Sequence, residues 1–402
     1  MSYIEDWFNQ TNITFTQPLT DIDASRLFAN LTPQIRKEFF TQWIKYRKEQ
    51  EYIVYDVSSL STYSNNLDIA EWGYNRDQES LPQINIGMYY GMTSQIPVYY
   101  DIYSGSIPDK TYLEFMMTNA KDMGLKQVCF VLDRGFVSEE NMCFLYGQGF
   151  SFITATPSSR VDVLRLIDEH KSSVRSITNW ISEYEVYGMV CEVEWFGLKL
   201  WAHVYYDSEK QSFDEKELYG YVGRLQAELE KMVACKGVGR RYRDFFVVEE
   251  EEVQRSGLSY KLDAGKVNER LGRAGFFVLL CSDGGLSSGE VLGLYRGRDV
   301  VEKGFWQFKN RLDFRRVRTH WARTLEGKLF VGFLALILRS YMGRVLRTSV
   351  ELKYLTFDKV LLELEKIRTV TMSDSKQVLV PLTKLQKTIL ATFNVQTETL
   401  TV

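Results

Sequence analysis

The segment EYIVYDVSSLS, from Glu51 to Ser61, is rich in tyrosine, isoleucine and valine, and it carries one acid, Asp56, near its middle. This composition predicts a β-strand. Two further strand-like segments follow, QINIGMYY from Gln83 and IPVYYDIYSG from Ile96. Only residues 91–95 separate them, so we expect a hairpin. A carboxylate in an apolar strand is costly to bury without a partner or a metal ion, which makes Asp56 a candidate functional residue.

Beyond the hairpin, helical and strand-like patterns alternate. A helix over Asp109–Met123 precedes the strand KQVCFVLD, which ends at Asp133, and a helix over Ser138–Tyr146 precedes the strand FSFITATP. The order of three strands, helix, strand, helix and strand is that of the first half of an RNase H-like α/β fold with a mixed central sheet. Sheets of this class expose reactive groups at strand ends, so Asp133 is a second candidate. From position alone, a strand-edge role for Asp56 and a turn-initiating role for Asp133 are equally good explanations.

The length of 402 residues exceeds that of a single hydrophobic core, so we expect several regions. Strand-like runs and one long helix interrupt the alternating pattern in the second quarter of the chain and beyond, which predicts an inserted, largely β subdomain. The four expected regions are an N-terminal helical region (1–50), the first half of the core (51–183), the inserted subdomain (184–283), and the completion of the core with a helical C-terminal region (284–402).

The expected helix from Ser288 to about Asn310 carries polar side chains where a core helix would be apolar. Four of them follow one another at spacings of three, four and seven residues and therefore share one broad face. They are Tyr295, Arg298, Glu302 and Lys309. Considered alone, the pattern is explained better by a solvated face, because Arg298 and Glu302 are also spaced as an i,i+4 ion pair.

Charge is distributed unevenly along the chain. The formal net charge of −3 gives no sign of nucleic-acid binding on its own. The stretch after Tyr295, however, carries many basic residues and only three acids. The basic residues are Arg296, Arg298, Lys303, Lys309, Arg311, Arg315, Arg316, Arg318 and Arg323. A basic patch is usually a solvated face, but this one surrounds the polar helix.

The sequence gives no signal for a zinc site, a disulfide framework or a membrane segment. Its five cysteines include no CxxC pair, and its three histidines lack the spacing of metal ligands. The longest strongly apolar run, Phe330–Leu338, is shorter than the roughly 20 residues that a membrane helix needs. The N-terminus also lacks the pattern of a signal peptide. We therefore expect a cytoplasmic protein without a membrane partner.

Three motifs, in this order, resemble those of bacterial insertion-sequence transposases of the IS-four superfamily type, which share a DDE motif of catalytic carboxylates. YDVSSL around Asp56 is similar to the family's first-Asp motif, and VLDRGFVSEENM (131–142) is similar to its second-Asp motif. The spacing Y-x2-R-x3-E-x6-K, which begins at Tyr295, matches the family's Y-R-E-K signature. The segment after Asp56 also resembles the family at Gly73, Asp77, Pro82, Gln83, Gly87 and Pro97.

The resemblance implies an RNase H-like core that is interrupted by an inserted, largely β subdomain before the third carboxylate. It implies that Asp56, Asp133 and Glu302 are catalytic and ligate two Mg²⁺ ions, for which Mn²⁺ can substitute. Mg²⁺ takes oxygen ligands, and a pair of such ions activates a water or a 3′-hydroxyl while stabilising the leaving oxygen. The implied reaction is cut-and-paste DNA transposition: cleavage at the transposon ends, then strand transfer into a target.

The resemblance also implies the partners. Tyr295, Arg298 and Lys309 would contact DNA phosphates near the transposon end, a task that suits arginine through bidentate pairing and lysine through its point charge. The DNA partners are the terminal inverted repeats and the target, bound by a homodimer at the nucleoid of a bacterial or archaeal cell. Trp195 and Trp201 are candidates to stack on an unpaired base, although packing explains both better.

One departure from the family leaves an alternative open. Members of the family carry a longer N-terminal region that recognises the transposon ends, whereas only about fifty residues precede Asp56 here, without a clear helix-turn-helix pattern. A truncated or inactive relic that binds DNA without excision is therefore the alternative function. A nuclease that cuts without strand transfer is less consistent with the Y-R-E-K pattern.

Overall fold

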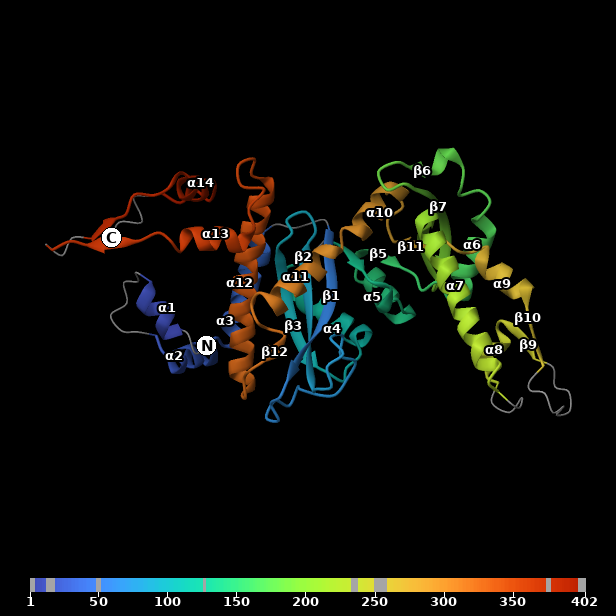
Figure 1. The fold of residues 1–402 in the computed structure, drawn as a ribbon, viewed down its shortest axis with the longest axis horizontal. Helices are drawn as coiled ribbons and strands as arrows, with labels where there is room; N and C mark the ends of the chain where they lie inside the picture. The colour runs from blue at the N-terminus through green and yellow to red at the C-terminus, as the bar shows by residue number, and fades with distance from the viewer. Residues whose placement is uncertain are drawn as a thin grey trace. The chain divides into compact units, whose positions relative to one another are not determined.

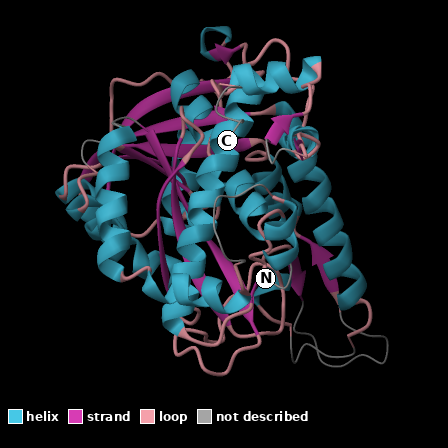
Figure 2. Cartoon of the chain, turned by 90° about the vertical axis from the view of Figure 1, so that its left-hand side faces the viewer, coloured by secondary structure: helices cyan, strands magenta, loops and turns pink. Residues whose placement is uncertain are grey.

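The computed structural model describes residues 4–11, 19–47, 52–125, 128–232, 238–248, 259–373 and 377–396. The chain divides into two compact units: unit 1 comprises residues 1–132 and 297–402, and unit 2 comprises residues 133–296. Both units contain helices and strands, so the chain is a mixed α/β protein (Figure 1, Figure 2).

Unit 1 is built on a mixed sheet of the strands β1 Tyr52–Thr62, β2 Gln83–Gly91, β3 Pro97–Ser104, β4 Cys129–Leu132 and β12 Arg316–Val317. Four of them lie in the order β3-β2-β1-β4. The long strand β1 pairs antiparallel with β2, and it pairs parallel with β4 and with the short β12. Nearly all residues of β1 and β2 are buried, as in strands covered on both faces. β1 is thus the centre of the sheet, and β2 and β3 form the expected hairpin.

The helices described in unit 1 are α1 Ile4–Gln10, α2 Asp21–Asn30, α3 Pro33–Arg47, α4 Asp109–Asp122, α11 Asp299–Asn310, α12 Ala322–Thr348, α13 Phe357–Leu364 and α14 Lys384–Thr392. The long helix α12 packs against α2, α11, α13 and β3 (Figure 1). Its Gly327 allows α2 to approach closely, because a Cβ there would overlap the backbone carbonyl of Phe28. By length and composition alone α12 could cross a membrane, a test that core helices also pass, and its Leu325, Leu329 and Phe333 are buried. A short hairpin near the C-terminus pairs β13 Thr369–Thr371 with β14 Gln377–Leu379.

Aromatic rings join the N-terminal helix α3 to the rest of unit 1. The ring of Phe40 lies 4.8 Å from that of Tyr99 in β3 and 5.4 Å from that of Phe333 in α12, centroid to centroid and edge to face. Such aromatic pairs add about 0.5–1.5 kcal/mol to the burial of their surface. The N-terminal helices therefore belong to the same compact unit as the sheet, and the unit boundaries differ from those of the four expected regions.

Unit 2 contains an antiparallel sheet of β5 Ser151–Ala155, β11 Phe276–Cys281, β8 Leu198–Tyr206, β7 Val186–Trp195 and β6 Trp180–Ile181, paired in that order. Its described helices are α5 Glu139–Gly147, α6 Val161–His170, α7 Ser208–Leu229, α8 Arg240–Arg243, α9 Ala264–Leu271 and α10 Ser288–Arg296, with single 3-10 turns η1 Arg134–Phe136 and η2 Ile177–Asn179. Helices α6 and α10 pack on this sheet. A second small core includes Leu225, Leu229, Tyr242 and Phe246, at the end of α7 and beside the strand pair β9 Phe246–Val248 and β10 Tyr260–Leu262.

The elements expected through Pro157 are confirmed, with their ends shifted by a few residues. Glu51, Lys126 and Gln127, at the starts of two expected strands, lie outside the described residues. The region expected to be a largely β insertion contains helices α7, α8 and α9 as well as strands, and α7 alone has 22 residues.

The prediction of one continuous helix from Ser288 to Asn310 is wrong. The structure divides it into α10 and α11 at Gly297 and Arg298, which is also where unit 2 ends and unit 1 resumes. Glycine weakens a helix interior, and the local bonding is of the tighter i→i+3 kind. The amide of Val300 donates to the carbonyl of Gly297 at 3.3 Å, and that of Val301 donates to the carbonyl of Arg298 at 3.2 Å.

Candidate active site

Asp56 lies in the middle of β1, opposite Met88 of β2 in the ladder. Side chains alternate along a strand, so Asp56 points to the other face of the sheet from its neighbours Tyr55 and Val57. Both neighbours are buried, whereas Asp56 is only partly buried. Burial is the main cause that raises the pKa of the Tyr55 hydroxyl, and the negative charge of Asp56 contributes to the rise. The strand therefore carries a partly accessible carboxylate in a largely apolar setting.

Glu302 lies in the first turn of α11, the helix that packs against β1 and β2. The helix is held by an apolar face that includes the buried Val301 and Phe305. Gly304 allows the closest contact, because a Cβ at this position would overlap the ring of Tyr90 in β2. Glu302 is thus carried by a helix whose position on the sheet is fixed by packing.

The carboxylate of Glu302 is open to solvent. Its side chain is 54% exposed, and its Oε1 lies 3.4 Å from Nη2 of Arg298. Exposed i,i+4 ion pairs contribute only about 0.3–0.5 kcal/mol, so the half-exposed Glu302 can exchange this partner for another ion. Because α11 packs on β1, Glu302 and Asp56 belong to elements in direct contact within unit 1.

Asp133 directly follows β4 in the chain and precedes the 3-10 turn η1. The hydroxyl of Tyr295, in α10, donates a hydrogen bond to its Oδ1 at 3.3 Å. The hydroxyl of Thr154, in β5, donates to its backbone carbonyl at 3.5 Å. Within unit 2 the structure therefore brings together two of the residues predicted from sequence, the second carboxylate and the tyrosine of the Y-R-E-K pattern.

The three predicted carboxylates are divided between the two units, with Asp56 and Glu302 in unit 1 and Asp133 at the start of unit 2. Among the residues that the structure describes, no group of three or more His, Cys, Asp and Glu side chains is arranged so that it could hold a metal ion. The chemistry of the donor set does suit a hard divalent cation, because all three candidates are carboxylates and Mg²⁺ and Mn²⁺ favour such oxygen ligands. Their assignment as catalytic residues and metal ligands stays a prediction.

We expected the four Y-R-E-K residues to share one face of a continuous helix, but the structure divides them between two helices. Tyr295 lies in α10, Arg298 occupies the break as the N-cap of α11, and Lys309 lies in the last turn of α11. Only Arg298, Glu302 and Lys309 belong to unit 1. The predicted DNA contacts of Tyr295, Arg298 and Lys309 stay predictions.

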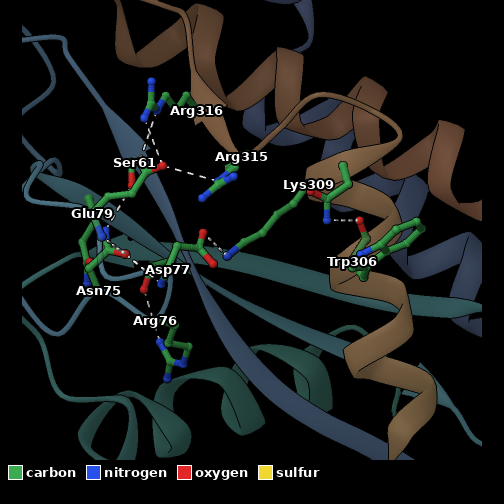
Figure 3. Close-up of polar contacts among 12 residues, drawn as sticks. Ser61, Asn75, Arg76, Asp77, Glu79, Trp306, Lys309, Arg315 and Arg316 are labelled. Atoms are coloured by element: carbon green, nitrogen blue, oxygen red, sulfur yellow. Dashed lines mark hydrogen bonds and ion pairs between the residues drawn. The ribbon is translucent and has the colours of Figure 1, made fainter.

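Lys309 is buried, with only 7% of the residue exposed. Its Nζ donates to Oδ2 of Asp77 at 2.7 Å (Figure 3). Burial lowers the pKa of Lys309, and the negative charge of Asp77 opposes that effect. Asp77 occupies one of the three donors of this ammonium. The structure thus gives Lys309 a partner inside the protein where we expected one in DNA.

The loop between β1 and β2 contributes residues that the sequence reading underestimated. Asp77 was singled out only through the family resemblance, and Glu79 was not singled out at all. Glu79 forms ion pairs with Arg315 at 3.3 Å and with Arg316 at 3.1 Å (Figure 3). The partners of Asp77 and Glu79 are Lys309 and Arg316, which lie more than two hundred residues further along the chain. Local sequence spacing therefore could not have predicted either pair.

The two tryptophans proposed as base-stacking candidates are engaged in packing. Trp195 is buried, and the guanidinium of Arg160 lies 5.5 Å from the centroid of its ring. The ring of Trp201 lies against the backbone of Gly284, where a Cβ would overlap it. These contacts agree with the packing explanation for both.

Comparison with protein families gave a match over most of the chain. The transposase DDE domain model matches residues 47–338. The comparison with curated proteins gave no match.

Two solved structures are among those similar to this chain. One is a cryo-EM structure of the piggyBac transposase synaptic complex with hairpin DNA, at 11% identity and a TM-score of 0.40, over 88% of this chain and 66% of that chain. The other is the Mos1 transposase paired-end complex with the left transposon end, at 10% identity and a TM-score of 0.20, over 40% of this chain and 50% of that chain. This chain spans less than two thirds of the length of either. Because the family model covers well over half of this chain, including Asp56, Asp133 and Glu302, the chain belongs to the transposase DDE domain family.

Proposed function

We propose that this chain is a DNA transposase that cleaves DNA at transposon ends and transfers the cut strands into a target. The observation that carries the proposal is the family match over residues 47–338, which contain all three candidate carboxylates. The packing of α11 on β1 supports it, because this contact puts the first and third carboxylates on adjoining elements. The Y-R-E-K spacing supports the finer placement in the IS-four superfamily.

We further propose that unit 1 is an RNase H-like core. The strand order β3-β2-β1-β4, with antiparallel hairpins followed by a parallel fourth strand, agrees with the element order expected from sequence. In the chain, unit 2 is inserted between β4 and α11, that is, before the third carboxylate. Unit 2 contains the expected insertion (184–283) but begins earlier, at Asp133, and its content is mixed rather than largely β.

In the proposed mechanism, Asp56, Asp133 and Glu302 hold two divalent cations, Mg²⁺ or Mn²⁺. Bound there, the cations would supply an activated water or 3′-hydroxyl and would stabilise the leaving oxygen. Carboxylates that act together repel one another, so they remain ionised as a group only beside positive charge. The hydroxyl of Tyr295 would orient Asp133, which it contacts at 3.3 Å. Arg298 would balance the charge of Glu302 until a cation takes its place.

The proposed partner is DNA: the terminal repeats and the target, bound by a homodimer. Exposed basic side chains close to α11 in the chain can pair with phosphates without losing a buried contact. They include Arg311 and Arg318. Direct DNA contacts of Tyr295 and Arg298 belong to the same proposal.

The proposal is tested by nicking of a supercoiled plasmid that carries the flanking element ends, in the presence of Mg²⁺. Wild type is compared with Asp133→Ala and Glu302→Ala. Asp299→Ala is the matched control, because Asp299 is an exposed acid in the same first turn of α11. Metal-dependent nicking at the ends that is lost in the first two variants and kept in the control supports the proposal. A wild type that binds DNA but never nicks it would instead support the relic alternative.

A further inference from the structure

Lys309 and Asp77 form a buried ion pair inside unit 1. The side chains are 8% and 23% exposed, and the ammonium and carboxylate are 2.7 Å apart. A buried lysine is costly unless a counter-charge accompanies it, and removal of either partner leaves the other uncompensated. This pair therefore resists exchange, unlike the exposed pair of Glu302 with Arg298.

Asp77 is in turn fixed to strand β1 through its loop. Its backbone amide donates to Oδ1 of Asn75 at 2.9 Å, and Nδ2 of Asn75 donates to the hydroxyl of Ser61 at 3.0 Å. Nη1 of Arg76 donates to the hydroxyl of Ser59 at 3.4 Å. Ser59 and Ser61 lie in β1, a few residues after Asp56. The carboxylate that holds Lys309 is thus tied to the strand that carries the first candidate ligand.

The same loop also holds the chain just beyond α11. Glu79 accepts hydrogen bonds from Arg316 at 3.1 and 3.2 Å, and these bonds are the main cause that lowers the pKa of Glu79. The amide of Arg315 donates to the carbonyl of Lys309 at 3.2 Å, and the carbonyl of Arg315 accepts from the amide of Ser61 at 3.3 Å. Figure 3 shows these contacts converging on the loop from β1 and from the end of α11.

Lys309 and Glu302 lie on the same side of α11. They are seven residues apart, which is close to two helical turns and about 10 Å along the axis. A restraint at Lys309 therefore adds to the packing of Val301, Phe305 and Gly304 in limiting rotation of α11 and slip along β1. Glu302 moves with any slip or rotation of the helix.

We propose that Lys309 is a positioning residue: its ion pair with Asp77 fixes α11, and with it Glu302, relative to β1 and Asp56. This inference rests on the proposed function, because it concerns the placement of a proposed metal ligand.

The test compares Lys309→Met and Asp77→Asn, alone and together, with Lys303→Met as the control. Lys303 lies in the same helix, but its side chain is 71% exposed and its partner Asp299 is exposed as well. One measurement is the Mn²⁺ concentration that half-saturates cleavage of duplex DNA carrying a transposon end. The other is the affinity for the same duplex without divalent metal, as a function of salt concentration.

If Lys309 positions Glu302, both single variants raise the half-saturating Mn²⁺ concentration by roughly tenfold, as expected when support of a metal ligand is lost. The double variant is no worse than the more affected single variant, and Lys309→Arg recovers part of the loss. DNA affinity and its salt dependence stay at wild-type values in Asp77→Asn, which separates a loss of positioning from a loss of DNA binding. Lys303→Met leaves the Mn²⁺ requirement unchanged.

The inference is overturned if Lys309→Met weakens DNA binding and lowers its salt dependence by about one unit while Asp77→Asn leaves the half-saturating Mn²⁺ concentration unchanged. That pattern would mean that Lys309 contacts a phosphate. Should Lys309→Met not fold, Asp77→Asn decides alone: an unchanged Mn²⁺ requirement overturns the inference. If wild type neither cleaves DNA nor responds to Mn²⁺, the proposed function itself is overturned. If wild type cleaves DNA and only the comparison of the variants fails, the inference about Lys309 alone is overturned.

Discussion

The two ends of helix α11 differ sharply in their surroundings. At its start, Glu302 is about half exposed and shares a weak ion pair with Arg298. At its end, Lys309 is buried against Asp77. The sequence pattern treats Glu302 and Lys309 alike, as polar residues of one signature on one face. The structure separates them, because the loop between β1 and β2 places Asp77 beside Lys309 in the last turn of the helix.

This difference shows how one helix can combine a reactive end and an anchored end. A carboxylate that is to receive a cation must be able to exchange its partner, and a pair that contributes under about 1 kcal/mol allows this. A helix that is to hold the carboxylate in place needs a contact that does not exchange, and a buried ion pair provides one. Substitution of Glu302 should therefore affect the cleavage rate more than the free energy of unfolding. Substitution of Lys309 or Asp77 should affect the free energy of unfolding more than the cleavage rate.

The largest expected effect is on activity at the exposed end. Glu302→Gln removes one proposed metal ligand and with it several kcal/mol of charge stabilisation in the transition state, so cleavage should fall by roughly a thousandfold or more. The free energy of unfolding of this variant should stay within about 0.5 kcal/mol of the wild-type value, because the substituted side chain is exposed. Single-turnover cleavage and calorimetry measure the two quantities. A stable variant that retains wild-type cleavage would remove Glu302 from the site.

The next effect is on stability at the anchored end. Asp77→Asn leaves the charge of Lys309 buried without a counter-charge, so we expect the free energy of unfolding to fall by about 3 kcal/mol. Lys303→Met, on the exposed side of the same helix, should change it by less than about 0.5 kcal/mol. Denaturant unfolding of both variants provides the comparison. An equal loss of unfolding free energy in Asp77→Asn and Lys303→Met would show that the pair of Lys309 with Asp77 does not stabilise the protein more than an exposed ion pair does.

The middle of α11 offers a smaller effect. In Gly304→Ala the new methyl group would overlap the ring of Tyr90, so we expect a loss of about 1–3 kcal/mol in unfolding free energy. Gly223→Ala in α7 is the control, because a Cβ there meets nothing within 4 Å and the change should stabilise by up to about 1 kcal/mol. Two substitutions of the same kind should thus act in opposite directions. A stabilising Gly304→Ala would mean that α11 is not held by this contact.

The smallest expected effect is a pH dependence that sharpens the contrast. Burial lowers the pKa of Lys309 in the folded state below its ordinary value of 10.5. Between the lowered pKa and 10.5 the unfolded chain binds the proton more fully than the folded chain does, so stability rises with pH in that window. Wild type should gain stability relative to Lys309→Met as the pH approaches 10.5. A wild type that instead loses stability relative to Lys309→Met as the pH rises toward 10.5 would contradict the lowered pKa of Lys309.

Local patterns were enough to predict the strands and helices through β5. β1, β2 and β3 are long, apolar and separated by clear turn residues, so composition and spacing determined them. The same patterns could not reveal the break at Gly297, because the helical periodicity continues across it and one glycine is tolerated in many helices. A long helix was expected within the insertion and is present as α7, but the strand-like runs around it led us to describe the whole region as largely β.

The candidate carboxylates could be identified from sequence only with the help of the family motifs. From position alone Asp56 and Asp133 had ordinary explanations, and Glu302 resembled half of a surface ion pair. The burial of Lys309 could not be predicted from local sequence, because its ion-pair partner Asp77 lies 232 residues away along the chain. Such long-range pairs are set by the topology of the sheet and its loops, which local spacing does not encode.

The central claim is that Asp56, Asp133 and Glu302 act together as ligands of divalent cations. The most direct measurement is Mn²⁺ binding, followed by electron paramagnetic resonance, with duplex DNA of the transposon end present. Asp56→Asn, Asp133→Asn and Glu302→Gln are compared with wild type and with the control Asp299→Asn. The account predicts that wild type and the control bind Mn²⁺ and that each of the other three variants binds it much more weakly. Wild-type Mn²⁺ affinity in any of these three would contradict the account.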